Sequence, residues 1–174
     1  LKSIKAHEHY PKVEAVFSSP LKRCKDSAKI MFPESNTIII DDFIEYNFGE
    51  FEQCTAEDLK NNDDFKNWIR GDMNARTPYG ESNAEFVSRV CLAFEKVIDG
   101  CIKTGTNNVA IVGHAGVLMT ILSCYGLPEA PMAHWQMDAG YGYKLRITPS
   151  LWMQGRKLEV IDTSPTSIKD MTND

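Results

Sequence analysis

Hydrophobic and polar positions alternate along the chain in blocks that predict a strand followed by a helix. The run Val13–Ser18 is apolar and β-branched, which is typical of a buried strand. A helix signal follows at once, because Ser19 can cap a helix and Pro20 fits its first turn. We therefore expect a helix over residues 20–31 and a second short strand at Thr37–Ile40.

The strongest helix signal begins at Ser82. Ser82 and Glu85 form an S-x-x-E capping box, in which each side chain accepts from a free backbone N–H of the other residue. The apolar residues that follow recur at helical spacing, namely Phe86, Val90, Phe94, Val97 and Cys101. The pattern predicts one long helix with a single apolar face.

The remaining pattern adds further strands and helices. The apolar run 108–113 predicts a strand that leads directly into a helix over Ala115–Tyr125. Two later strands are expected at Tyr141–Ile147 and Lys157–Ile161, with a turn near Gln154 between them. Residues 41–55 read as a long loop with some helix, and residues 63–70 as a short helix.

Alternation of strands and helices favours an α/β fold with a mostly parallel sheet covered on both faces, a three-layer α/β/α architecture. The chain of 174 residues is long enough for one compact domain with a real core. We assign residues 1–162 to a single domain and residues 163–174 to a flexible polar tail.

Charge and composition exclude several classes of protein. A net charge of −5 argues against nucleic-acid binding but leaves a small phosphorylated substrate open, since a few local arginines suffice for an anion. No apolar run reaches the roughly 18 residues that cross a membrane, and the first residues lack a secretory signal. The five cysteines contain no C-x-x-C motif, which favours reduced thiols and a cytoplasmic location. The oligomeric state stays open, with a homodimer as one option.

Three short segments place chemistry at the ends of predicted strands, where open α/β sheets bind ligands. In SSPLKR, Arg23 falls in the first turn of a helix, where it could grip a phosphate, although a solvated surface arginine is the alternative. In VGHAGV, His114 lies between small residues and could bind a phosphate or transfer a proton, although a structural histidine is the alternative. In PYGES, Glu81 could donate a proton, or simply favour a helix N-terminus.

Taken in order, SSPLKR, the acidic stretch with FGEFE, P-x-GES and VGHAGV resemble the histidine phosphatase (phosphoglycerate-mutase-like) superfamily. The likeness runs from about Val13 to Ile161, and it is nearest to small phosphatases such as the α-ribazole phosphatase group.

This resemblance implies that a histidine attacks a phosphoryl group, giving a phosphohistidine that water hydrolyses. It implies phosphate binding by Arg23, phosphoryl binding by His114 and protonation of the leaving group by Glu81. Ser18 and Ser82 are secondary candidates, near the phosphate or orienting Glu81. No metal or organic cofactor is implied.

The chain departs from the superfamily at its start. An R-H-G motif should end the first strand and supply the nucleophile, yet nothing here matches it. His7 and His9 have the wrong neighbours and read as surface residues. We expect that one strand and its crossover helix, roughly 30 residues, precede Leu1 in a longer protein. Without that strand, two neighbouring edges of the sheet should lie open.

Four functions compete on the sequence alone. The leading one is a phosphomonoester hydrolase that acts on a small phosphorylated metabolite through a phosphohistidine. A phosphoglycerate-type mutase is the second, and a non-catalytic phosphate-binding domain the third, should the nucleophile be absent. A metallohydrolase is disfavoured, because the four histidines show no H-E-x-x-H or similar ligand spacing.

Overall fold

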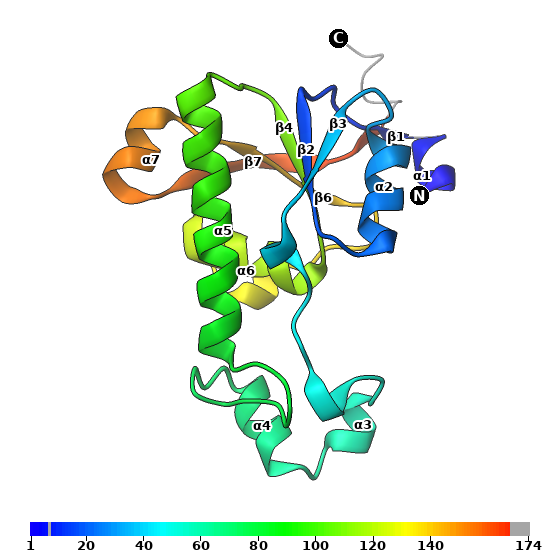
Figure 1. Ribbon diagram of the computed structural model, residues 1–174, viewed down its shortest axis with the longest axis vertical. Coiled ribbons are helices and arrows are strands. Elements are labelled where there is room, and N and C mark those ends of the chain that lie inside the picture. Colours follow the sequence, from blue (N-terminus) through cyan, green and yellow to red (C-terminus); the bar gives the residue numbers. More distant parts are fainter. Residues whose placement is uncertain (7, 168–174) are drawn as a thin grey trace.

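The computed structural model describes residues 1–6 and 8–167 (Figure 1). The α-helices are α1 (Lys2–Lys5), α2 (Lys22–Met31), α3 (Ala56–Leu59), α4 (Asp63–Ile69), α5 (Asn83–Thr104), α6 (Ala115–Tyr125) and α7 (Pro149–Gly155). The strands are β1 (Glu8–His9), β2 (Ala15–Ser18), β3 (Asn36–Ile39), β4 (Val109–Val112), β5 (Gly126–Leu127), β6 (Gly142–Arg146), β7 (Leu158–Ser164) and β8 (Thr166–Ser167). Three short 3-10 helices are η1 (Asp41–Phe43), η2 (Gly49–Phe51) and η3 (Met132–Trp135).

The strands form two three-stranded sheets and one small pair. One sheet has the order β3-β2-β4, with both pairings parallel, and the other has the order β5-β7-β6, with β6 antiparallel to β7. Strands β1 and β8 form a separate antiparallel pair. The predicted α/β class is confirmed, and so is the expected break in the sheet. Within the described ranges, β4 and β6 each pair with one neighbour and leave the other edge open.

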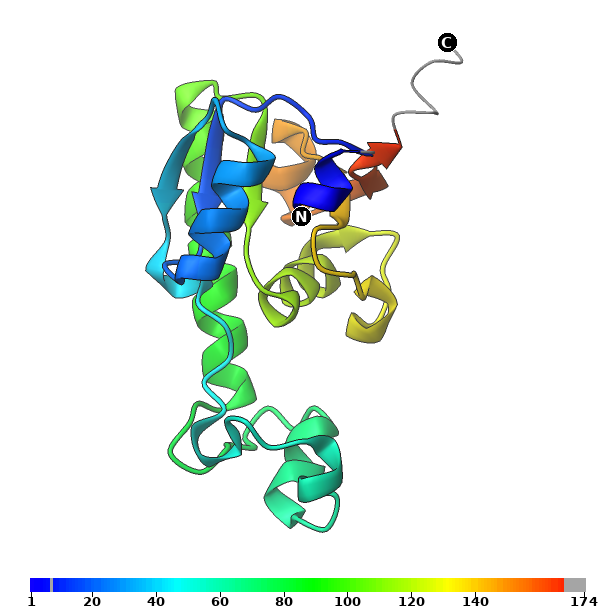
Figure 2. The ribbon, with the colours of Figure 1, turned by 90° about the vertical axis from the view of Figure 1, so that its right-hand side faces the viewer.

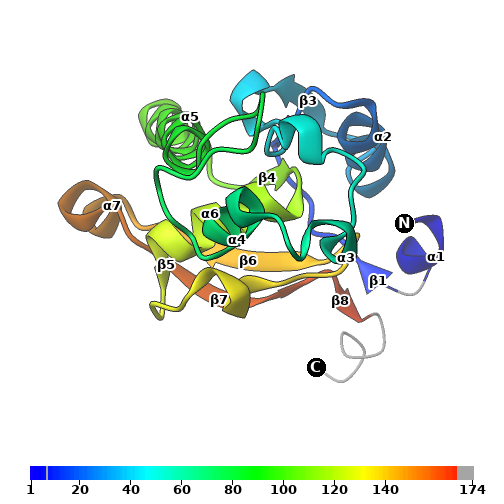
Figure 3. The ribbon, with the colours of Figure 1, turned by 90° about the horizontal axis from the view of Figure 1, so that it is seen from below.

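Helices cover both faces of the β3-β2-β4 sheet. Helix α2 lies against one face and α5 stands on the other, as Figures 1 and 2 show from perpendicular directions. The β6–β7 pair lies on the side of the molecule away from α2 and β3 (Figure 3). Two apolar cores follow from this layering. The smaller lies between α2 and the sheet, around Val16 and Ala28, and the larger joins α5, α6 and β7, around Phe94 and Ile121.

Helix α5 confirms the predicted capping box. The Ser82 hydroxyl accepts from the backbone N–H of Glu85, and the Glu85 carboxylate accepts from that of Ser82. The predicted apolar face is buried along its length. The helix ends at Gly105, whose φ of 70° lies in the left-handed region that glycine adopts without strain. Among residues 1–6 and 8–167, no helix is both long and apolar enough to span a bilayer.

The predicted start of α2 was wrong in its details. Leu21, not Ser19, is the N-cap, and the helix begins at Lys22. Ser19 is fully buried, and its hydroxyl lies 2.7 Å from Nε2 of His114 while accepting from the backbone N–H of Leu21 at 3.3 Å. Tertiary contact with the histidine has replaced the local capping contact that the sequence pattern favours.

The C-terminal region is more regular than predicted. A helix, α7, occupies the place of the turn expected near Gln154, because Trp152 is fully buried against Phe94 and Tyr125. Strand β7 continues to Ser164 and β8 follows it, so the tail does not begin at residue 163. Residues 168–174 of the predicted tail lie outside the described residues.

Residues 47–82 form a lobe beyond the N-terminal end of α5, containing η2, α3 and α4 (Figures 1 and 2). Aromatic rings fill it, with Trp68 in edge contact with Phe48 at 5.6 Å and with Tyr46 at 5.4 Å between ring centroids. The Asn83 side-chain amide ties the lobe to α5 by donating to the carbonyls of Trp68 and Asp72. Helix α5 therefore contacts the lobe at its N-terminal end and packs into the larger core along its length.

Candidate active site

The structure brings Arg23 and His114 together, as the sequence predicts. Strands β2 and β4 are parallel neighbours that end in register at Ser18 and Val112. The helices that follow them, α2 and α6, therefore begin at the same sheet edge. Arg23 lies in the first turn of α2 and His114 is the N-cap of α6, so Nη2 of Arg23 reaches 3.0 Å from Nδ1 of His114.

The contacts of His114 select one tautomer. A guanidinium has only donors, so Nδ1 must accept from Arg23 and the proton of the neutral ring must sit on Nε2. That N–H donates to the Ser19 hydroxyl at 2.7 Å. Burial lowers the pKa of His114 below its ordinary value. The positive charges of Arg23 and Arg89 lower this pKa further, whereas the negative charge of Glu45 raises it. The ring is therefore neutral at pH 7, oriented by its two partners.

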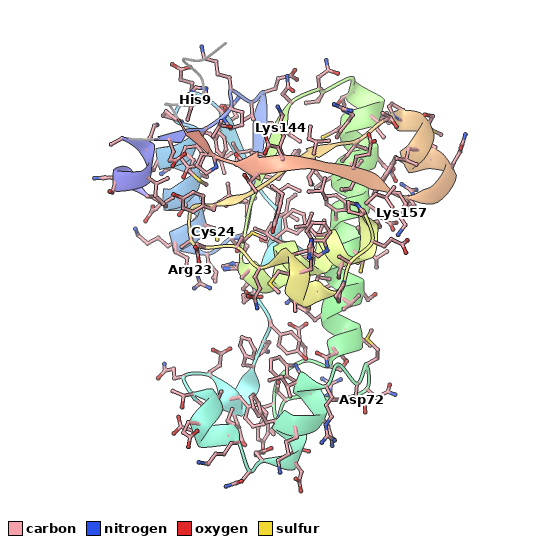
Figure 4. All side chains as sticks on the ribbon, turned by 180° about the vertical axis from the view of Figure 1, so that it is seen from behind. His9, Arg23, Cys24, Asp72, Lys144 and Lys157 are labelled. Atoms are coloured by element: carbon pink, nitrogen blue, oxygen red, sulfur yellow. The ribbon has the colours of Figure 1, made fainter. Side chains whose placement is uncertain are left out.

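Cys24 lies beside this pair, in surroundings that disfavour its reactive form. Its sulfur is 3.5 Å from Nε2 of His114, and the side chain is buried next to Arg23 (Figure 4). Burial raises the pKa of the Cys24 thiol, so the reactive thiolate is disfavoured. The cysteine serves as a small packing residue against the imidazole.

Glu45 is a site residue that the sequence reasoning missed. Its carboxylate accepts from the backbone N–H of Gly116 at 3.2 Å, in the first turn of α6, and from that of Tyr46 at 2.9 Å. Its charge acts on His114 and on Cys24. Glu45 follows η1 in a loop with no periodic pattern, so the sequence offered no helix or strand end to mark it.

Glu81 has a different environment from the one expected of a proton donor. Its two carboxylate oxygens accept hydrogen bonds from Nε and Nη2 of Arg89 at 2.9 and 2.6 Å, and from the backbone N–H of Asn47 at 2.8 Å. Within the described part of the chain, Glu81 has no hydrogen bond to Arg23 or His114. The role of Glu81 as proton donor stays a prediction. What the structure shows is that its carboxylate is bonded to Arg89.

Arg89 joins this carboxylate to the loop that carries Glu45. Its Nη1 donates to the carbonyls of Asp42 and Ile44, each at 2.8 Å, and its Nη2 donates to the carbonyl of Glu45 at 3.1 Å. We call the Glu81–Arg89 pair, with these carbonyl contacts, the brace. The brace holds residues 42–45 against α5 and so fixes where Glu45 meets the N-terminus of α6.

The two serines proposed from the sequence have structural contacts. Ser18 is fully buried at the end of β2, and its hydroxyl donates to the carbonyl of Ser19 at 2.9 Å. It supports the turn that places Ser19 under His114. Ser82 caps α5 and so sets the direction in which Glu81 leaves the turn.

The other histidines of the described chain lie elsewhere. His9 is exposed on β1, far from Arg23 in Figure 4, which agrees with its interpretation as a surface residue. His134 is exposed in η3, and His7 lies outside the described residues. Across residues 1–6 and 8–167, no group of three histidine, cysteine or carboxylate side chains is arranged to hold a metal ion.

Arg23 and neutral His114 meet where α2 and α6 begin. A charged donor at a helix N-terminus is an arrangement that receives an oxyanion. The family model of the histidine phosphatase superfamily (branch 1) matches residues 5–156. The chain belongs to this superfamily. No curated protein matches it in sequence.

Several solved structures share the fold at low sequence identity. The α-ribazole phosphatase from Shigella flexneri matches with a TM-score of 0.73 at 19% identity, over 92% of this chain and 78% of that one. A mutant phosphoserine phosphatase from Entamoeba histolytica, in complex with phosphoserine, matches with a TM-score of 0.57 at 22% identity, over 79% and 66% of the two chains. The phosphoglycerate mutase from Bacillus anthracis matches with a TM-score of 0.51 at 18% identity, over 64% and 59%.

Proposed function

We propose that this histidine phosphatase superfamily member is a phosphomonoester hydrolase that acts on a small phosphorylated metabolite through a phosphohistidine. The observation that carries the proposal is the 3.0 Å approach of Arg23 to His114 where α2 and α6 begin. Arg23 supplies a charged donor for the phosphoryl oxygens, and the first turn of α2 supplies backbone N–H groups. Such groups stabilise the charge that spreads over those oxygens during transfer. In α6 the N–H of Gly116 already donates to Glu45.

In this proposal His114 binds the phosphoryl group and does not attack it. Its Nδ1 is engaged by Arg23 and its Nε2 proton points to Ser19, so neither nitrogen offers a free lone pair in the unliganded site. On phosphate binding, Arg23 turns to the anion and the ring can donate to a phosphoryl oxygen. The attacking histidine is the one that the superfamily resemblance assigns to an R-H-G segment.

Protonation of the leaving group falls to Glu45 in this scheme. Its carboxylate is near enough for its charge to act on His114, whereas the Glu81 carboxylate is occupied by Arg89. In its protonated form Glu45 would give its proton to the departing alkoxide and become the carboxylate, which the backbone N–H groups of Tyr46 and Gly116 then stabilise. Glu81 acts through the brace as a positioning residue.

Phosphate binding and turnover are the decisive experiment. Calorimetry with inorganic phosphate should show binding that Arg23→Ala abolishes, and p-nitrophenyl phosphate should be hydrolysed by the full-length protein with transient, acid-labile phosphorylation of a histidine. Lys96→Ala, on the exposed side of α5, is the control and should change neither result. Failure of phosphate to bind would refute the proposal.

Two other functions remain candidates with distinct outcomes. A non-catalytic phosphate-binding domain is favoured by the observation that His114 is the one histidine of the described chain at this site. It predicts phosphate binding without turnover. A phosphoglycerate-type mutase predicts phosphoryl exchange between phosphoglycerates that outpaces release of phosphate.

A further inference from the structure

The outer edge of the β3-β2-β4 sheet is unpaired. Strand β3 is terminal in the sheet order, and its only partner among the described strands is β2. Ile40 donates its backbone N–H to Ser18 of β2, so by the two-residue period of a strand Ile38 also faces β2. Thr37 and Ile39 consequently direct their backbone N–H and C=O groups outward, where a further strand could bond to them.

A groove of about 520 Å³ runs along this edge, between β3 and α2. Thr37 and Ile39 line it from the strand, and Ile39 is 42% exposed, which is high for a large apolar side chain. The side chains that line the groove thus belong to the same residues whose backbone groups are free. A strand added to β3 would place alternate side chains in the groove.

The opposite wall of the groove is basic. Lys22, Lys25 and Lys29 line it from α2, together with Asp26. Spacings of three and four residues put the lysines on one side of the helix. Lys22 is paired with Asp26 at 2.5 Å, whereas Lys25 and Lys29 have no ion-pair partner in the described part of the chain. The wall therefore carries surplus positive charge on a protein whose net charge is −5.

The spacing of these charges fits an extended chain. Lys25 and Lys29 are separated by roughly 6 Å along a helix that rises 1.5 Å per residue. Alternate residues of a strand repeat every ~7 Å, so two successive groove-facing side chains of an added strand match the spacing of these two lysines. Carboxylates at those positions would meet the unpaired ammonium groups.

We propose that the β3 edge and the α2 lysine row form a docking site for an acidic, extended peptide segment of a partner protein, which adds as a strand to β3. Backbone hydrogen bonds to Thr37 and Ile39 provide the pairing, and Lys25 and Lys29 select alternating acidic side chains. Neither Arg23 nor His114 belongs to the lining of this groove.

A second copy of this chain fits the same edge poorly. Two β3 strands paired about a two-fold axis would place both α2 helices on the same face, with their lysine rows side by side. Like charges at that spacing repel, and lysines beside an edge strand are a common means by which proteins prevent such self-pairing. The positive charge of the α2 lysines therefore disfavours pairing with a second copy of this chain and attracts an acidic strand.

The test uses a fluorescein-labelled peptide in which glutamate alternates with threonine, followed by fluorescence anisotropy with the full-length protein. We expect saturable binding that weakens by about 10-fold or more in the Lys25→Glu, Lys29→Glu double variant, since two ion pairs become two repulsions. Amide exchange at Thr37 and Ile39 should slow in the complex. Lys96→Glu with Lys103→Glu, on α5, changes net charge equally and should leave binding unchanged.

A second peptide, N-methylated at alternate residues, separates strand addition from simple attraction of charge. Because the methylated residues are those whose N–H groups face β3, this peptide keeps every glutamate but cannot donate backbone hydrogen bonds to β3, so we expect its binding to be lost. Equal binding of both peptides, or equal weakening by the α5 control variant, would overturn the proposal. So would dimerisation of the protein through β3 in competition with the peptide. Unchanged phosphate affinity in the Lys25→Glu, Lys29→Glu variant would show that its fold and site are intact.

Discussion

Replacing Arg89 with methionine tests whether the brace holds the site together. The Glu81 and Arg89 side chains are only 13% and 20% exposed, and Arg89 also satisfies three backbone carbonyls of the loop before and at Glu45. Methionine keeps the length of the apolar stem but leaves the carboxylate buried without its partner. Removing one member of a buried ion pair costs about 3–5 kcal/mol. Since some solvent reaches this pair, we expect a loss near the lower end, about 3 kcal/mol.

Urea denaturation followed by circular dichroism measures this loss. Arg76→Met is the matched control, because the Arg76–Glu85 ion pair is 51% exposed on both sides and an exposed ion pair adds little to stability. Glu81→Gln keeps the shape but not the charge, so the double variant with Arg89→Met should cost less than the sum of the single variants. If Arg89→Met costs no more than Arg76→Met, the brace does not stabilise the fold as argued.

Three further outcomes follow from the site and its surroundings. Glu45→Gln should slow hydrolysis of an alkyl phosphate far more than that of p-nitrophenyl phosphate, because only the alkyl leaving group needs a proton. Glu81→Gln should slow the hydrolysis of both substrates equally. The reverse pattern would show that Glu81 is the proton donor. Folding lowers the pKa of His114, so the folded state binds this proton less readily than the unfolded state does. The protein should therefore keep its full stability above pH 6.5, the ordinary pKa of histidine, and lose stability as the pH falls below that value. In urea denaturation at a series of pH values, His114→Gln should reduce this loss. The neighbouring Cys91 thiol lowers the pKa of Cys124 below its ordinary value, so alkylation of Cys124 by iodoacetamide should begin at a lower pH than for an ordinary thiol. Cys91→Ser should move the midpoint upward.

Local sequence signals predicted the elements whose cause is local. The capping box at Ser82 and the apolar spacing after it are sufficient to define α5, and both appear in the structure as predicted. Arg23 and His114 could also be placed together, because parallel strands that precede helices bring their following residues to one edge. These inferences needed only the periodicity and the order of elements.

Contacts between distant segments decided the remainder. Ser19 bonds to a histidine 95 residues away instead of capping the next helix, and α7 forms because Trp152 is buried against α5 and α6. Glu45 reaches the site through a loop that Arg89 holds from 44 residues away. No pattern within a window of the sequence reports such pairings, so neither Glu45 nor the brace could be found before the structure.

The close approach of Glu45 to Gly116 has a consequence for sequence variation. A Cβ at position 116 would lie 2.6 Å from Oε1 of Glu45, at the movable end of a side chain and not against backbone. An alanine there would displace the carboxylate while leaving the helix intact, so under the proposed role of Glu45 a substitution at position 116 would affect the reaction more than the fold. Among relatives of this chain, glycine at position 116 and the acid at position 45 should therefore be retained or lost together. An alignment in which the residues at positions 45 and 116 vary independently would contradict a role of the Glu45 carboxylate in the reaction.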